Sequence, residues 1–392
     1  MRPDLQARQI LKLARDLGTI TRGHVVEALG VSMPTATGLV GDLVGQGVLI
    51  EKGREQSVGG RPAVLFALNP DYMFAVGVEC SLLGIEAVLT DLGGRVHSRH
   101  SVDAMISPRP EQLMELLYKV VEATLSDHRG KHLGGIGVGI SGLVDRKHGL
   151  SIRFPRAEAW DNVPVARLLS ERFGLPVVVE NDVQAATLAH LRFGVGRGVR
   201  HFLYVHIGHG IRLGIVADGK LYEGATGKAG ELGHVMVAPE GPVCYCGNYG
   251  CLESMAGPSA IVGQAREAVL KGVESSILSL AGGNVEKVNF RVVLEAAGQG
   301  DKLAVNLLEK AGQHIGQVLA NLANILEPEL LITGGIGRDL LKPLMEVITG
   351  KFRLAAMPGI RDRVRVELSG FERFPCALGA GILGLERIFE GE

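Results

Sequence analysis

The sequence predicts a mixed α/β protein with two related lobes, preceded by a winged helix-turn-helix unit. Near the N-terminus, helical periodicity and a turn are followed by two short strands. From about Phe74 onward, buried strands alternate with helices, which is typical of an α/β fold. We therefore expect one domain over residues 1–70 and a second, two-lobed domain over residues 71–392.

The N-terminal unit is predicted from the spacing of its apolar residues. The first helix, within "RQILKLARDLG", has an apolar face made of Ile10, Leu13, Ala14 and Leu17. A short helix, a turn at Gly30 and a second helix follow, and Ser32 is a suitable N-cap for that second helix. Its buried face comprises Ala36, Leu39, Val40, Leu43 and Val44. "VLIEKGREQSVGGRPAVLFALNP" then predicts two strands around a glycine-rich, basic loop.

The remainder of the chain predicts two successive series of strands and helices. "FAVGVECSLLGIEAVLTDLGG" opens the first series with strands, and "PVVVEND" is a later strand that ends in polar residues. "HFLYVHIGHGIRLGIVADG" opens the second series, and "ELLITGG" is its last clear strand. Open α/β folds bind ligands at the carboxyl ends of their strands, so we look for a site there.

Composition limits the classes of function. The 392 residues carry a formal net charge of −1, so nucleic-acid binding would have to come from a local basic patch. The N-terminal segment has no apolar signal core, and no apolar run reaches about 18 residues, so we expect no membrane insertion. Cysteines are few and unevenly spaced, unlike a disulfide framework. We expect a soluble, cytoplasmic protein.

Three cysteines lie within "CYCGNYGC", at Cys244, Cys246 and Cys251. Glycines between them allow the chain to fold back so that the thiolates converge. Zinc favours four tetrahedral ligands, and His234 is the nearest histidine upstream. We therefore expect a structural Zn²⁺ on these four residues. The alternatives are three unligated loop cysteines or a disulfide.

Polar residues follow several predicted strands or lie in loops near the cysteines. They are Ser141 and Gly142 in "GISGLVD", Asn181 and Asp182 in "VVVEND", Glu231 and His234 in "GELGH", and Glu253 in "GCLES". Carboxylates and amides that accept and donate hydrogen bonds suit the hydroxyls of a sugar. Each residue also has an ordinary structural alternative: Asn181 and Asp182 could cap the next helix, and Glu231 could form a loop salt bridge.

On the basis of these segments, the chain resembles the ROK family (repressors, open reading frames and sugar kinases) over nearly its whole length. The motifs are "ENDVQAA", "GATGKAGELGHV", "CYCGNYGCLES" and "LLITGGIG", in family order. The resemblance implies a two-lobed actin-like, ribonuclease-H-like ATPase fold. It implies zinc on the four residues named above and sugar hydroxyls on Asn181, Asp182, Glu231, His234 and Glu253. Asp182 occupies the general-base position of the family's kinases.

The phosphate loops differ from those of the family's kinases. The first loop has the form D-x-G-G-T in kinases, and here Glu79 is followed by Ser81, Leu82 and Leu83. Apolar side chains there prevent close approach of a phosphate. We therefore expect no enzyme activity and no catalytic residue, with Asp182 a vestige. A ROK-type sugar kinase with an accessory head is the alternative.

The second phosphate loop, G-T-G-x-G-G-G in kinases, is "GHGIRLG" here. His209 replaces the threonine, and Arg212 and Leu213 replace glycines. The arginine could instead bind an anion, such as the phosphate of a sugar phosphate. The third motif, "TGGIG", is intact.

The N-terminal unit resembles the DNA-binding heads of the family's repressors, and "GGRPA" matches the end of their wing. Its second motif helix would enter the major groove and offer Met33, Thr35, Thr37 and Gly38 to the bases. Contacts to phosphates or the minor groove would come from Arg22, Lys52, Arg54 and Arg61. The second helix carries no Arg or Lys, and the alternative for this unit is a protein-interaction module.

These features together predict a sugar-responsive transcriptional regulator, a repressor of carbohydrate-metabolism genes. It would bind operator DNA as a homodimer or homotetramer, and a sugar or sugar phosphate in the inter-lobe cleft would release or retune it. A sugar-transport protein is an alternative signal.

Overall fold

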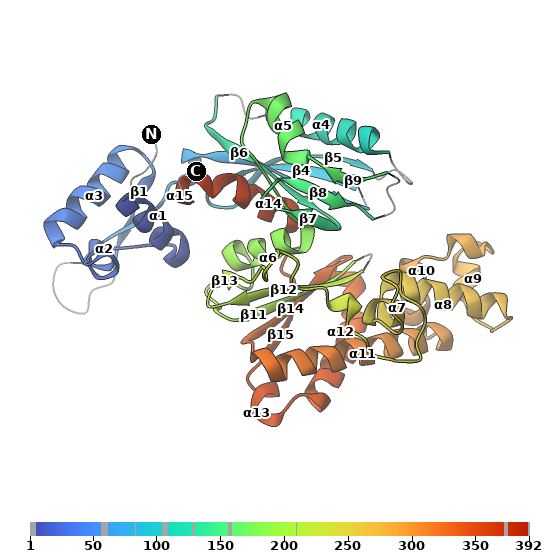
Figure 1. Cartoon of the computed structure of the whole chain (residues 1–392). Coiled ribbons are helices and arrows are strands. Elements are labelled where there is room, and N and C mark those ends of the chain that lie inside the picture. The colour runs from blue at the N-terminus through green and yellow to red at the C-terminus, as the bar shows by residue number, and fades with distance from the viewer. Residues whose placement is uncertain are drawn as a thin grey trace. The chain divides into compact units, whose positions relative to one another are not determined.

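The computed structural model describes residues 5–55, 62–82, 84–103, 109–127, 130–155, 159–208, 210–371 and 375–390. The chain forms two compact units, Met1–Phe193 with Phe374–Glu392, and Gly194–Arg373. Figure 1 shows the elements of both. Within the described ranges, every helix is too short or too polar to cross a membrane. The predicted boundary at residue 70 stays a prediction.

The first elements of the chain have the predicted winged helix-turn-helix order, and we call them the head. They are α1 (Leu5–Leu17), α2 (Arg22–Leu29), α3 (Met33–Gly45), β1 (Leu49–Arg54) and β2 (Val64–Leu68). Helix α2 ends at Gly30, whose φ of 66° is the left-handed conformation that glycine adopts readily. Ser32 caps α3 as expected, since its hydroxyl accepts from the Thr35 amide at 3.3 Å. Strands β1 and β2 pair antiparallel as the hairpin of the wing.

The buried face of α1 differs from the predicted one. Ile10 and Ala14 are buried as expected, but Leu17 is 54% exposed and Leu11 is buried instead. Leu17 is the last residue of the helix, and the chain turns directly after it. Helix α1 contacts both β2 and the short helix α15 (Arg387–Glu390), so its buried face turns toward Leu11.

The first unit contains a five-stranded sheet in the order β10-β6-β3-β4-β5. Its strands are β3 (Phe74–Ser81), β4 (Gly84–Asp91), β5 (Val96–Asp103), β6 (Leu133–Ile140) and β10 (Val177–Asn181). Helices α4 (Pro110–Ser126) and α5 (Val165–Phe173) cover one face, and α6 (Asp182–Phe193) and α14 (Pro375–Leu385) cover the other (Figure 1). A smaller sheet comprises β7 (Leu143–Asp145), β8 (Leu150–Arg153) and β9 (Asp161–Val163).

The second unit repeats the sheet topology of the first. Its strands are β11 (Phe202–Ile207), β12 (Ile211–Ala217), β13 (Lys220–Leu221), β14 (Leu330–Gly335) and β15 (Arg365–Leu368). In each sheet, three antiparallel strands continue into two parallel ones, β13-β12-β11-β14-β15 here. Its helices are α7 (Leu252–Ala256), α8 (Pro258–Leu270), α9 (Ile277–Leu280), α10 (Phe290–Gly298), α11 (Lys302–Leu326), α12 (Arg338–Ala355) and α13 (Pro358–Arg361). The repeated topology confirms the prediction of two related lobes.

Candidate functional site

The first group of predicted residues lies where β10 ends and α6 begins. The hydroxyl of Ser141 donates to Oδ2 of Asp182 at 2.5 Å, and Nδ2 of Asn181 donates to the carbonyl oxygen of Gly142 at 3.1 Å. Asn181 is 5% exposed, while Asp182 is less buried. The structure therefore brings these four residues of the first unit together, with the Asp182 carboxylate held by a hydroxyl donor.

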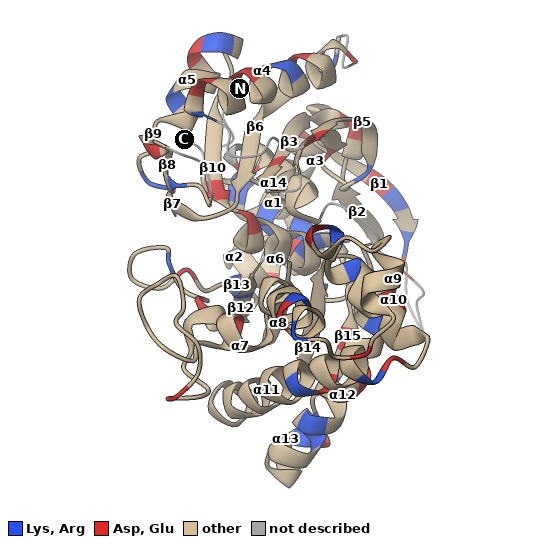
Figure 2. Cartoon of the chain, turned by 90° about the vertical axis from the view of Figure 1, so that its right-hand side faces the viewer, with Lys and Arg blue, Asp and Glu red and all other residues tan. Residues whose placement is uncertain are grey.

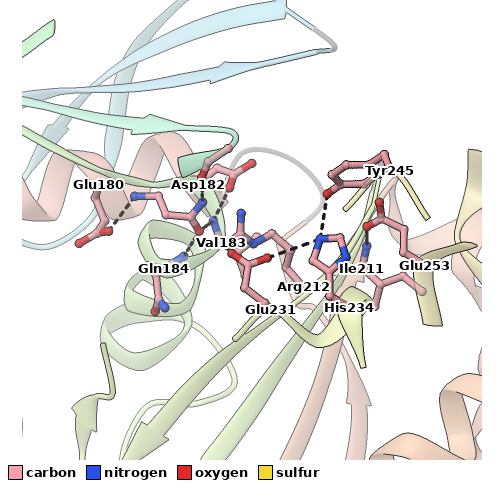
Figure 3. Close-up of polar contacts among 12 residues, drawn as sticks. Glu180, Asp182, Val183, Gln184, Ile211, Arg212, Glu231, His234, Tyr245 and Glu253 are labelled. Carbon is pink, nitrogen blue, oxygen red and sulfur yellow. Dashed lines mark hydrogen bonds and ion pairs between the residues drawn. The ribbon is translucent and has the colours of Figure 1, made fainter. Parts of the chain in front are cut away.

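The structural alternative for Asn181 and Asp182 also holds. Oδ1 of Asn181 accepts from the amides of Val183 at 3.0 Å and Gln184 at 3.3 Å, and Oδ1 of Asp182 accepts from Val183 at 2.9 Å. Figure 3 shows Asp182, Val183 and Gln184 at this helix end. Both side chains thus satisfy otherwise free amides of the first turn. Capping fixes the orientation of the Asp182 carboxylate and leaves Oδ2 on Ser141.

Glu79, which the resemblance aligns with the kinase aspartate, stands on β3. Burial first, and then the carboxylates of Asp182 and Glu86, raise its pKa to about 8. Strands β3 and β4 are joined by a two-residue turn, because Ser81 pairs with Gly84. Within that turn Leu83 lies outside the described residues. The described residue of the turn, Leu82, is apolar and partly buried.

The second loop lies between β11 and β12. The Gly208 amide donates to the Gly210 carbonyl oxygen at 2.9 Å, and His209 between them lies outside the described residues. The Arg212 guanidinium donates to the carboxylate of Glu231 (Figure 3). The salt-bridge alternative for Glu231 is therefore observed, and its partner is the arginine that the sequence suggested for an anion.

Glu253 and His234 occupy the second unit beside the cysteine loop. Oε2 of Glu253 accepts from the amide of Ile211 at 2.9 Å, and burial is the main cause of the raised pKa of this carboxyl. Nε2 of His234 lies 3.0 Å from the Tyr245 hydroxyl and 4.0 Å from Oε2 of Glu231 (Figure 3). The structure brings Glu231 and His234 together. Glu231 directly precedes the short 3-10 helix Leu232–His234, and His234 is its last residue.

The four predicted metal ligands converge. Nδ1 of His234 lies 3.6 Å from Sγ of Cys244, and Sγ of Cys246 lies 3.7 Å from Sγ of Cys251. All four ligand atoms lie within 4.8 Å of one another. A tetrahedral zinc ion separates two sulfur ligands by about 3.8 Å and a sulfur from a nitrogen by about 3.6 Å. The donor set and spacing fit such an ion, so these residues could hold a metal.

Close backbone packing shapes the cysteine loop. Gly250 has a φ of 57°, and a Cβ at this position would lie 1.5 Å from the carbonyl oxygen of Ala238. Only glycine fits there, which lets the chain return and place Cys251 beside Cys246. Cys251 and Cys244 are buried, at 0% and 3% exposed, while Cys246 is exposed.

The head presents part of the predicted DNA-contacting set on its surface. Met33, Thr35, Thr37 and Gly38 of α3 are exposed, and so are Lys52 and Arg54 of β1, whose basic positions are blue in Figure 2. The Thr37 hydroxyl already donates to the Met33 carbonyl oxygen at 2.8 Å. The Arg22 guanidinium lies over the Phe66 ring, 4.8 Å from its centroid. Arg61 lies outside the described residues.

Sequence reasoning missed Tyr245 and Arg146. Tyr245 stands between two cysteines, where spacing alone points only to a metal. Nη1 of Arg146 lies 3.2 Å from Oε2 of Glu180, the residue before Asn181. The sequence carries no signal for this pair, because the two residues belong to separate strands and loops.

Comparison with known proteins places this geometry in a family. The model of the ROK family matches residues 75–386. A putative xylose repressor from Caldicellulosiruptor sp. (strain Rt8B.4) is 31% identical over 376 residues, which are 94% of this chain and 92% of that protein.

Solved structures include both regulators and kinases. A ROK family transcriptional regulator, a homologue of the E. coli Mlc protein, has a TM-score of 0.82 at 26% identity, covering 99% of this chain and 96% of that one. A ROK family glucokinase from Streptomyces griseus, solved with glucose and AMPPNP, has a TM-score of 0.70 at 30% identity, covering 79% of this chain and 98% of that one. Because the family model matches well over half of its residues, the chain belongs to the ROK family.

Proposed function

We propose that this protein is a sugar-responsive transcriptional regulator that represses carbohydrate-metabolism genes. One observation carries the proposal: a winged helix-turn-helix head precedes a ROK region whose β3–β4 turn carries Leu82, where the resemblance implies a phosphate-binding glycine in the kinases. The similarity to a putative xylose repressor extends over 94% of this chain, so it includes the head. The similarity to the glucokinase covers 79%.

The residues proposed to bind the carbohydrate are Ser141, Gly142, Asn181, Asp182, Glu231, His234 and Glu253. Oδ2 of Asp182 and the carboxylates of Glu231 and Glu253 would accept from sugar hydroxyls. A sugar that binds one conformation of the protein more tightly than another would shift the equilibrium between DNA-bound and free protein. Pairing of Arg212 with Glu231 favours an uncharged sugar over a sugar phosphate, because the guanidinium already has a carboxylate partner.

We further propose that the His234, Cys244, Cys246 and Cys251 set binds a structural Zn²⁺. The spacing of the ligand atoms supports this choice, and a set of three thiolates with one imidazole is typical of structural zinc. The ion would fix the imidazole of His234 through Nδ1 and leave Nε2 facing Tyr245 and Glu231. Zinc would thereby help to order His234, one of the residues of the second unit proposed to bind the sugar.

A sugar kinase is the second candidate, favoured by the similarity to the glucokinase. Asp182 could serve as a general base, but phosphoryl transfer depends on positioned phosphates. Leu82 in the β3–β4 turn and the Arg212–Glu231 pair oppose this candidate. Release of ADP from ATP with D-glucose, D-xylose or N-acetyl-D-glucosamine would favour the kinase.

The proposed function is tested by fluorescence anisotropy with labelled DNA from upstream of the protein's own gene, at fixed salt. A scrambled duplex of equal length is the control. D-xylose, D-glucose, N-acetyl-D-glucosamine and the 6-phosphates of the two hexoses are then added. We expect saturable binding that one uncharged sugar reverses. Absence of specific DNA binding contradicts the regulator, and binding that no sugar changes would point to a partner such as a sugar-transport protein.

The assembly state of the DNA-bound protein stays a prediction of a homodimer or homotetramer. Two heads on one operator would read two half-sites about one helical turn apart, or a multiple of that spacing. Sedimentation of the free protein measures the assembly state, and footprinting of the operator measures the half-site spacing.

A further inference from the structure

We propose that helix α6 transmits sugar binding to the head, and that the ion pair between Arg192 and Asp16 is the connection. The inference rests on the proposed function, since it names how the proposed sugar ligands would act on the proposed DNA-binding head. In this account Arg192 is a positioning residue that touches neither sugar nor DNA.

One end of α6 carries residues that are proposed to bind the sugar. Asp182 is the first residue of the helix, and Asn181 precedes it. Oδ1 atoms of both side chains accept from amides of the first turn, while Oδ2 of Asp182 is held by Ser141. A sugar hydroxyl that replaced or joined Ser141 at Oδ2 would therefore act directly on the first turn of α6.

The body of α6 is held tightly by its surroundings. Every residue from Val183 to Leu191 is buried. The helix packs against α14, and a Cβ on Gly379 would lie 1.7 Å from the carbonyl oxygen of Ala185, so the two backbones are in contact. Close-packed elements move as bodies between discrete arrangements, because they cannot deform continuously. A displacement at Asp182 would therefore reach Arg192, about 15 Å further along the helix axis.

The other end of α6 touches the head. Nη1 of Arg192 lies 3.1 Å from Oδ1 of Asp16 in α1, and the Arg192 side chain is 15% exposed. Burial lowers the pKa of this guanidinium, so the carboxylate of Asp16 compensates a partly desolvated charge. The same oxygen of Asp16 accepts from Nε of Arg15 at 2.9 Å. Asp16 is thus a junction between α6 and α1.

Helix α1 can carry the displacement further into the head. Its contacts include α2, α3 and β2, so it belongs to the same packed body as the proposed DNA-reading helix. The Arg15 guanidinium also lies over the ring of Phe389 in α15, 4.9 Å from the centroid. Helices α6 and α15 therefore hold the two adjacent residues Arg15 and Asp16.

A second set of ion pairs begins beside Asn181 and ends at α15. Arg146 lies 3.2 Å from Glu180 and 3.8 Å from Glu386, the residue between α14 and α15. Glu180 also accepts from the Asn181 amide at 2.7 Å. The same strand end is thus joined to the head by α6 and by these charges. Because α6 is continuous and buried, we place the principal coupling in Arg192.

The test compares full-length wild-type protein with Arg192→Gln and Asp16→Asn. Arg197→Gln, an exposed arginine a few residues beyond α6, is the matched control. Calorimetry measures the affinity for D-xylose, D-glucose and N-acetyl-D-glucosamine. Hydrogen–deuterium exchange of residues 5–17 is measured with and without the sugar that binds, and operator affinity is measured by anisotropy. Asp16 is 51% exposed, so its substitution leaves the fold intact even if that of Arg192 does not.

We expect wild type and Arg197→Gln to change exchange in α1 when sugar binds. In Arg192→Gln and Asp16→Asn, sugar affinity should stay within about threefold, while the sugar-induced change in operator affinity falls at least about fivefold. The sugar-induced change in α1 exchange should fall in parallel. Equal responses in all four proteins would overturn the inference and leave the proposed function standing. A wild type that binds none of the three sugars would overturn both.

Discussion

The hydroxyl of Ser141 donates a 2.5 Å hydrogen bond to Oδ2 of Asp182, joining the end of β6 to the start of α6. Oδ1 of the same carboxylate accepts from the Val183 amide. Asp182 is therefore oriented before any ligand arrives. Preorganised acceptors of this kind lower the cost of ordering on binding.

Substitution of Asp182 tests the proposed sugar-binding residues. Asp182→Ala should weaken sugar binding by about 10-fold to 100-fold, because it removes hydrogen bonds to a charged acceptor. Operator affinity without sugar should stay close to that of wild type. Calorimetry measures the sugar affinity, and anisotropy measures the operator affinity. The control is Asp161→Ala, at an exposed aspartate of β9. A normal sugar response in Asp182→Ala would remove this residue from the site.

Loss of one thiolate tests the metal. Cys246→Ser should reduce bound zinc from one ion per chain to substoichiometric content, because an exposed hydroxyl is a poor zinc ligand. The buried Cys80, changed to alanine, is the control and should retain zinc. Elemental analysis of protein purified without added metal gives the ratio. A wild type without zinc would contradict the proposed metal.

The pH dependence of stability tests Glu79. Its pKa is raised from 4.5 to about 8, so the folded state binds this proton more tightly than the unfolded state. The neutral carboxyl therefore contributes its full stability below about pH 4.5 and loses it as the pH rises toward 8. Glu79→Gln should raise the free energy of unfolding by about 1–3 kcal/mol at pH 9 and change it little at pH 5.

Urea unfolding at the two pH values measures this difference. Glu86→Gln is the contrasting variant, since Glu86 accepts from Arg99 at 2.8 Å and should lose stability at both pH values. A Glu79→Gln effect that is equal at pH 5 and pH 9 would show that the carboxyl is ionised throughout.

Salt dependence tests the wing. Lys52→Ala and Arg54→Ala should each weaken operator binding, and each should reduce the slope of log K against log salt by about one, as for one phosphate contact. Lys271→Ala, at an exposed lysine of the second unit paired with Glu267, is the control. Slopes that stay at the wild-type value in both wing variants would place the DNA contacts elsewhere.

Local patterns predicted much of the fold and much of the site's arrangement. Strand alternation predicted two lobes, and the spacing of Cys244, Cys246 and Cys251 led to His234 as their neighbour. Apolar periodicity failed at Leu17, because a single helix cannot reveal which second element it packs against. Sequence patterns did not reveal that the Arg22 guanidinium lies over the Phe66 ring, and the contact of Arg22 with DNA stays a prediction.

Contacts between distant residues could not be predicted in this way. Arg192 and Asp16 lie on different helices with most of the first unit between them in sequence. Arg212 and Glu231 each had a separate interpretation, and only the fold shows that they pair. A side chain's charge is visible in a sequence, but its partner depends on tertiary packing.

The core of the head includes Ile388 and Phe389 together with Ile10 and Leu11. These residues are among the first and last described parts of the chain, so a ribosome making the protein completes the head's core only when α15 has emerged. A nascent or truncated chain that has already made α3 would therefore hold an incompletely packed head. Synthesis would therefore delay the completion of the head's core until α15 has been made.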